Sequence, residues 1–487
     1  MKEKPVSILT RRQFIRRAAC AALGTGALTA TVRDLRFLNA AMAQAAPTDY
    51  KALVCIFLSG GNDSNNLIVP TIPSEYADYS AIRGDALALP LSGAPNVVLP
   101  ISPLNSDGHQ YGLHPACPEL ATLFQEGKLA VLFNTGTLLY PLTRAQYLSG
   151  ALAKPPQLFS HSDQVMQWQT SIPDRAPMTG WGGRCADLLA AVQPDAPISL
   201  CVTLAGANTF EVGNTVSQYS VANSGAIGLW GVSGPRLQAL TNILALPNPN
   251  LQIRAHAGVV EHAIQTGGQL NAAIAATAAT NYWTVPFPTT VTSPTGGAGF
   301  SSYFASQLKM VARLIEAGHR GTANGGFGMK RQIFFCDVGG YDLHSGQTLG
   351  PGQTAVGPHA NLLAELSQSM FAFQRAMEQL GLSNNVTTFT ASDFGRTLLS
   401  NDSGSDHGWG SHHLILGGAV NGQRTYGKFP ALAVNGPDDT DTGRWIPSTA
   451  IDQYFATLAT WFGVDSGNLG TVFPNLSRFA TPKLGFV

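Results

Sequence analysis

Charged residues are scarce in this chain, and neither sign of charge is in excess. The 487 residues include 29 Lys and Arg and 29 Asp and Glu, so charged residues make up 12% of the sequence and the formal net charge is zero. Proteins that bind nucleic acids or anionic membranes through their overall charge carry a basic excess. The balance therefore excludes nucleic acid as an expected partner and gives no sign of general attachment to an anionic membrane.

Cysteine is also sparse, and the spacing typical of a zinc knuckle is absent. Of six cysteines, Cys20 lies near the N-terminus, and no two of the remaining five form a Cys-x-x-Cys pair. This excludes a zinc knuckle and a disulfide-built scaffold, although one disulfide stays open. Cys55 and Cys336 lie inside apolar runs, which predicts buried thiols in core strands.

The sequence lacks an apolar run long enough to cross a membrane. The weakly apolar stretch 18–32 is shorter than the ~20 residues that a membrane-spanning helix needs, and charged residues follow it directly. Before it stands Thr10-Arg11-Arg12-Gln13-Phe14-Ile15-Arg16, and after it Ala41-Met42-Ala43, a small-x-small cleavage site. This pattern predicts a twin-arginine signal over residues 1–43, which is an address and not an anchor. We expect a periplasmic or secreted mature chain, 44–487; the alternative is a basic, Ala-rich helix at an ordinary N-terminus.

Buried strands and amphipathic helices alternate along the chain. Short apolar runs predict strands at 52–58, 129–133, 198–204, 332–338, 386–391 and 413–416. Apolar residues at three-to-four spacing predict helices at 115–126, 181–192, 301–318, 360–380 and 450–462. The pattern indicates an α/β fold with a mainly parallel central sheet flanked by helices. Residues 206 to about 297, rich in Asn, Thr, Ala, Gly and Ser, are interpreted as an insertion or cap.

Polar, glycine-rich segments follow three of these predicted strands. They are Gly60-Gly61-Asn62-Asp63, Gly339-Gly340-Tyr341-Asp342-Leu343-His344 and Ser392-Asp393-Phe394-Gly395-Arg396, with Asp406-His407-Gly408 and His412-His413 soon after. The carboxyl ends of parallel strands meet at one sheet edge, so these groups are expected to converge. Carboxylate and imidazole ligands suit zinc, manganese or iron, as one or two ions. The candidate ligands are Asp63, Asp342, His344, Asp393, His407 and His413. Because neighbours on a strand face opposite ways, only one of His412 and His413 should face the site.

Together these motifs resemble a twin-arginine-exported bacterial family of unknown function, placed in the alkaline phosphatase and sulfatase superfamily. The resemblance covers nearly the whole mature chain. It implies metal ions held by Asp and His at the strand ends, with Asp63 as the first-strand ligand and His407 or His413 as the late histidine. The superfamily usually has a His directly after the Asp that corresponds to Asp393, but here Phe394 stands there. This departure leaves open whether one metal ion binds or two.

The resemblance also directs attention to a nucleophile near residues 140–150. Sulfatases carry a Cys-x-Pro-Ser-Arg motif there, but this chain has Tyr140 at the Cys position, so a formylglycine sulfatase is not expected. Thr143 is the candidate nucleophile, with Arg144 or Arg396 binding an anion through the planar guanidinium. Ser160 is a second candidate nucleophile. Thr143 also begins a Thr-Arg-Ala-Gln capping box, so an equally good interpretation is that it only caps a helix.

Two functions from different classes follow. The first is an exported, metal-dependent hydrolase of a phosphate or sulfate ester, either a small molecule or a group on a polymer. The second is a non-catalytic periplasmic binding or assembly protein that retains the fold and has a protein partner. A serine hydrolase of the Gly-x-Ser-x-Gly type is not supported, because no such motif ends a predicted strand.

Overall fold

The computed structural model describes residue 40 and residues 44–193, 197–229, 231–277 and 283–487. The predicted twin-arginine motif and the cleavage site lie outside the described residues. Within those ranges, no helix is both long and apolar enough to cross a bilayer.

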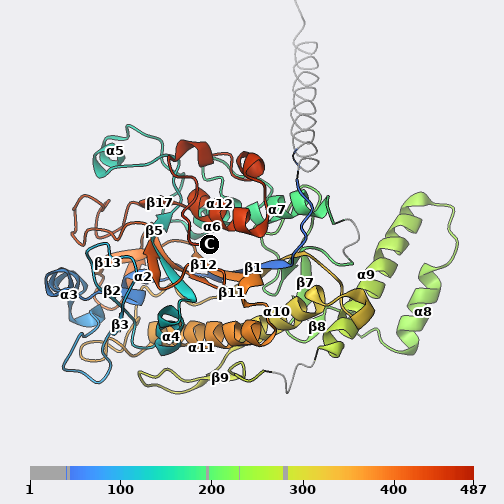
Figure 1. Ribbon diagram of the computed structural model, residues 1–487, viewed down its shortest axis with the longest axis horizontal. Coiled ribbons are helices and arrows are strands. Elements are labelled where there is room, and N and C mark those ends of the chain that lie inside the picture. The colour runs from blue at the N-terminus through green and yellow to red at the C-terminus, as the bar shows by residue number, and fades with distance from the viewer. Residues whose placement is uncertain (1–39, 41–43, 194–196, 230, 278–282) are drawn as a thin grey trace, which may run out of the picture.

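A ten-stranded mixed sheet forms the centre of the molecule (Figure 1). Its middle is parallel: β1 (Lys51–Leu58) lies between β11 (Arg331–Val338) and β12 (Val386–Ser392), and β6 (Cys201–Thr203) continues beyond β11. On the other side, β15 (Ser411–Leu416) runs antiparallel to both β12 and β5 (Leu129–Gly136). The outer strands are β16 (Arg424–Tyr426), β17 (Thr449–Ala450), β7 (Tyr219–Ala222) and β8 (Gly225–Ala226).

Helices cover both faces of this sheet (Figure 1). On one face lie α6 (His161–Thr170), α7 (Trp181–Ala190) and α12 (Ile451–Phe462). On the other lie α4 (Pro118–Gln125), α10 (Tyr303–His319) and α11 (Pro358–Gln379). Aromatic side chains fill the first interface; the buried ring of Trp181, for example, stacks on Phe455 with centroids 4.5 Å apart. Burial of such large rings contributes several hundred Å² of apolar surface to the core.

Shorter elements surround the sheet. Those near the strand ends are α2 (Ser64–Leu67), β2 (Ile68–Pro70), α3 (Pro73–Leu87), β3 (Leu99–Ile101), β4 (Tyr111–Leu113), α5 (Arg144–Ser149), β13 (Arg396–Ser400) and β14 (Ser405–His407). The segment interpreted as an insertion or cap contains β7, β8, α8 (Pro235–Leu244), α9 (Leu251–Ala276) and β9 (Thr290–Val291), which pairs with β10 (Phe300–Ser301). Its role as a separate unit stays a prediction.

The predicted α/β architecture is confirmed, and each expected strand and helix is present. The expected strand 198–204 is shorter than predicted, because only Cys201–Thr203 pairs with β11. The helix expected from Pro115 begins instead at Pro118, the first-turn proline of α4. Cys55 and Cys336 are buried in β1 and β11 as expected, and the five cysteines that the structure describes are all free thiols.

A buried acid, Glu211, lies next to β6. Glu211 is completely enclosed, and one carboxylate oxygen accepts a hydrogen bond from Asn208 (2.8 Å). Burial disfavours the charged form and raises the pKa of Glu211 to about 8. The acid is therefore neutral in the folded protein at neutral pH.

This pKa predicts that stability falls as the solution becomes more alkaline. Between the ordinary value of 4.5 and about 8, the unfolded chain loses the Glu211 proton while the folded chain keeps it. The free energy of unfolding should then decrease by up to about 1.4 kcal/mol per pH unit in that window. Glu211→Gln should flatten the pH dependence of denaturant unfolding there, whereas Glu261→Gln on the surface of α9 should not. An unchanged slope in Glu211→Gln would contradict the assignment.

Candidate metal centre

The carboxyl ends of β1, β11 and β12 meet at one edge of the sheet, as the alternation of elements predicted. The loop after β11 carries Asp342 and His344, and the loop after β12 carries Asp393. Two further segments reach the same place: the first turn of α6 supplies His161, and β14 supplies His407. Segments separated by more than 200 residues thus come together.

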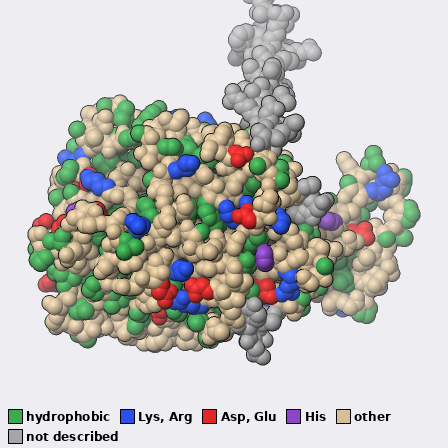
Figure 2. Space-filling model, viewed as in Figure 1, with side chains coloured by type: hydrophobic (Ala, Val, Ile, Leu, Met, Phe, Trp, Pro, Cys, Tyr) green, Lys and Arg blue, Asp and Glu red, His purple; other side chains and the backbone are tan. Residues whose placement is uncertain are grey.

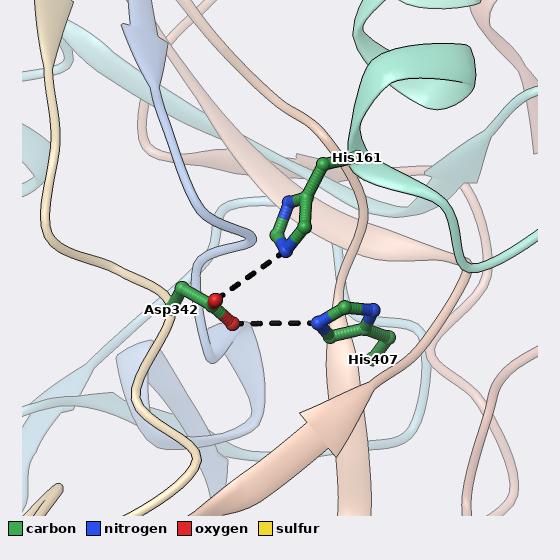
Figure 3. A group of neighbouring side chains, drawn as sticks. All are labelled: His161, Asp342 and His407. Carbon is green, nitrogen blue, oxygen red and sulfur yellow. Dashed lines mark ion pairs between the residues drawn. The ribbon is translucent and has the colours of Figure 1, made fainter.

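Three side chains converge there in a geometry that can hold a metal ion (Figure 3). His161, Asp342 and His407 each offer one ligand atom, and these atoms lie within 4.8 Å of one another. The His161 Nε2 is 3.5 Å from one Asp342 oxygen, and the His407 Nε2 is 3.4 Å from the other. His344 joins them, because its Nε2 lies 3.1 Å from Asp342 and 2.8 Å from the His407 Nε2.

The opposite nitrogen of each histidine is held by a hydrogen-bond acceptor. The Nδ1 of His161 lies 2.6 Å from an oxygen of Asp393, and the Nδ1 of His344 lies 3.0 Å from an oxygen of Asp406. The Nδ1 of His407 lies 2.7 Å from the Phe159 carbonyl oxygen. A carbonyl or an ionised carboxylate can only accept, so each Nδ1 carries the proton. In the neutral form of each ring, the Nε2 that faces Asp342 carries the lone pair, the arrangement typical of metal-binding histidines.

Charge at the site also favours a divalent cation. Asp342, Asp393 and Asp406 bring three carboxylates, and Arg396 is the cation that lies among them. Burial opposes ionisation of Asp342, but the hydrogen bond and charge of Arg396 outweigh it, so the pKa of Asp342 lies below its ordinary value. Burial likewise opposes ionisation of Asp406, but hydrogen bonds from Asn401 and His344 hold its pKa low. Three carboxyl groups thus lie around one guanidinium, an arrangement that favours a divalent cation.

An aromatic ring forms the floor of the centre. The buried Phe394 ring lies 4.8 Å from the ring of His161 and 4.6 Å from that of His407. It occupies the position at which the sequence resemblance implied a further histidine ligand. A Cβ on Gly61 would come within 2.6 Å of the Phe394 ring, which explains why a glycine stands there.

Gly60 is required by the same close packing. Its φ of +113° lies in the region that only glycine adopts easily, and a Cβ would overlap the backbone of Asp342. The amide of Gly60 donates to Asp393 at 3.1 Å, so this turn also fixes the carboxylate that holds His161.

The structure brings together four of the six predicted ligands. Asp342, His344 and His407 meet at the centre, and Asp393 contacts it through the His161 Nδ1. Asp63 lies elsewhere: it is buried and forms an ion pair with Arg83 and a hydrogen bond with Gln347 (2.5 Å).

His413 also lies elsewhere. Its ring packs on Trp168 at 4.7 Å, and its Nδ1 lies 3.4 Å from the Thr390 hydroxyl. Burial lowers the pKa of His413 to about 3, so it is an uncharged core residue.

The predicted catalytic residues are bound in structural contacts. Thr143 forms the capping box of α5 with Gln146, which confirms the structural interpretation. Arg144 donates to the Asp439 carbonyl (2.9 Å) and to Asn435 (3.0 Å). Arg396 is completely buried and donates to Asp342 (2.7 Å). Ser160 directly precedes His161 and donates to Asp163 at 2.7 Å.

His161 is a candidate ligand that is not among the six predicted from the sequence. Its segment, Phe159-Ser160-His161-Ser162-Asp163, was considered only for the Ser160 hydroxyl. The available signal was a histidine in a polar cluster directly before an amphipathic helix, where side chains often face a ligand. What the sequence did not reveal is that α6 begins above the ends of β1 and β12.

Comparisons with known proteins give a match to one family over part of the chain and no activity. Residues 236–456 match the model of a family described as "Protein of unknown function (DUF1501)". This agrees with the expected resemblance to a family of unknown function. No curated protein matches the chain.

One solved structure with distant similarity is the C-terminal periplasmic domain of EcEptC from Escherichia coli, in complex with Zn. It is 11% identical, and the match covers 77% of this chain and 75% of that one, with a TM-score of 0.24. At that score the likeness carries no argument about the site, whose assignment depends on its own geometry.

Removal of a ligand should abolish metal binding. We expect His161→Ala and Asp342→Ala each to lower the metal content of the purified protein to background in elemental analysis, because each removes one of the converging ligand atoms. His262→Ala, on the exposed surface of α9, is the control and should leave the content unchanged. Full metal content in both ligand variants would rule out this centre.

Weakening the support of His161 should have a smaller effect. Asp393→Asn keeps the size of the side chain but removes the charge that holds the His161 Nδ1, so the metal dissociation constant should rise by about 10- to 100-fold. A competition titration with a chromogenic chelator measures this. Asp63→Asn, which alters another buried carboxylate, is the comparison; an equal effect there would point to general destabilisation.

Proposed function

We propose that this chain is an exported, metal-dependent hydrolase of a phosphate or sulfate ester. The observation that carries the proposal is the common orientation of three imidazoles. Each Nδ1 is held by an acceptor, and each Nε2 faces Asp342. A hydrogen-bond acceptor behind every histidine is expected of a metal centre, whereas a cluster of surface side chains does not require it.

The residues of the centre have separate tasks. His161, His344, His407 and Asp342 would hold the ion, and zinc, manganese or iron fit this donor set. A divalent ion bound there would lower the pKa of a bound water and stabilise charge that develops on ester oxygens. Arg396, which is buried, orients Asp342 and is not available to grip a substrate.

The substrate class comes from the resemblance of the strand-end motifs to the alkaline phosphatase and sulfatase superfamily. Both candidate nucleophiles are hydrogen-bonded, Thr143 to Gln146 and Ser160 to Asp163, but Ser160 lies next to His161 in the chain. Ser160 is therefore the better candidate within the proposal. The twin-arginine motif supports export to the periplasm or beyond.

A specific observation favours the alternative, a non-catalytic binding or assembly protein. Thr143, Arg144 and Arg396 all have protein partners that satisfy them. If none of them acts on a substrate, the metal ion would stabilise the loops that carry its ligands, and a protein partner would be the functional ligand.

Turnover of a generic ester separates the two functions. The purified protein, loaded in turn with zinc, manganese and iron, should hydrolyse an aryl phosphate or an aryl sulfate. The activity should disappear with a chelator, return with the metal, and be lost in Asp342→Ala. Ser160→Ala should retain the metal and lose activity if the hydroxyl attacks. A metal-loaded protein without turnover of either ester would favour the binding protein.

A further inference from the structure

Two helices project from the body of the molecule as a hairpin. Figure 1 shows α8 and α9 side by side at the edge of the fold, beyond β7 and β8, and the two helices contact each other. No residue of α8 is buried, and the buried residues of α9 begin only at Thr266. The outer part of the hairpin, residues 235–260, therefore leaves most of its surface uncovered.

The tip of this hairpin is apolar on its outside. Along α8, the leucines at three-to-four spacing lie half-buried between the two helices; they are Leu237, Leu240 and Leu244. Other large side chains point outward: Leu246 is 64% exposed and Leu251 is 70% exposed, with Ile243 and Ile253 beside them in sequence. Figure 2 shows hydrophobic side chains gathered over this projection. An isolated exposed Leu is ordinary, but four such residues around one turn indicate a contact surface.

Charge is distributed unevenly around this tip. Residues 237–253 contain no charged side chain, and exposed arginines, Arg236 and Arg254, stand directly on either side. Residues 212–260 contain no Asp or Glu. Among the described residues neither arginine forms an ion pair; Arg236 donates only to the Gly231 carbonyl, at 3.2 Å. The balanced charge of the whole chain conceals this local basic segment.

We infer that the tip of the α8–α9 hairpin inserts shallowly into a lipid bilayer, with Arg254 binding lipid phosphates. Arg236, about 12 Å from the tip end of α8, adds positive charge above them. An apolar end with basic flanks and no acid is complementary to the acyl boundary and the anionic head groups above it. Arg254 is three residues into α9, about 4.5 Å along its axis, which matches the shallow depth of interfacial segments. Leu246, Leu251, Ile243 and Ile253 then lie below the head groups.

Vesicle flotation tests this inference independently of the metal centre. The purified protein should float with vesicles of phosphatidylethanolamine and phosphatidylglycerol, and less so at high salt. Leu246→Glu combined with Leu251→Glu should lower the bound fraction about tenfold or more, since each buried Leu contributes strongly. Leu104→Glu combined with Leu349→Glu, exposed elsewhere, is the matched control. All variants share one N-terminus, so differences report the hairpin.

Two further measurements test the roles of the arginines and of the apolar tip separately. Arg236→Gln combined with Arg254→Gln should weaken binding to the anionic vesicles and reduce its salt dependence, with little change on phosphatidylcholine alone. A polarity-sensitive dye on Leu251→Cys should shift to the blue with vesicles, whereas the same dye on Leu104→Cys should not.

Absence of flotation, or equal loss in the control pair, would overturn the inference. A wild-type dimer that the Leu246 and Leu251 changes convert to a monomer, without vesicle binding, would assign the tip to a second copy of the chain instead.

Discussion

The buried guanidinium of Arg396 joins the segments on which the candidate centre depends. It donates to the Gly60 carbonyl at the end of β1, to Asp342 in the loop after β11, and to the Ser405 carbonyl in β14. A charged group excluded from water is strongly destabilising unless its partners remain in place. The three segments are therefore held in one arrangement, and Asp342 keeps the position toward which the three histidines point.

The strands and the carboxylates at their ends could be predicted from the sequence because both are determined by residues close together in the chain. Apolar runs such as Val54–Phe57 within β1 fit only buried strands, and parallel strands place Asp342 and Asp393 at the same edge whatever the loops do. Which of the polar residues belong to the candidate centre depends instead on contacts between distant parts of the chain. Asp63 follows a strand as Asp393 does, but its side chain forms an ion pair with Arg83 of α3. The sequence around Asp63 gives no sign of this partner.

Histidines were harder to assign for the same reason. His413 has a neighbour in sequence, His412, and both belong to an inner strand of the sheet, so both are enclosed. Their burial was predictable from the apolar run Leu414–Leu416, and a buried imidazole without a metal remains neutral. His161 joins the candidate centre only because the loop after α5 brings the start of α6 over Asp393, a long-range contact that the spacing of residues in the sequence does not reveal.

The balanced composition of the whole chain does not reveal two places where charge is locally unbalanced. At the sheet edge, three carboxyl groups surround one buried arginine, and those of Asp342 and Asp406 are half exposed, so a cation can reach them. At the hairpin the departure is opposite: arginines border an uncharged apolar end in a segment without acids. Exposed apolar surface of this kind is costly in water, so a chain that keeps it needs a partner surface to cover it. Each departure is a local imbalance of charge or polarity, and each is matched by the ligand proposed for it: a divalent ion at the sheet edge, and a lipid head-group layer over acyl chains at the hairpin.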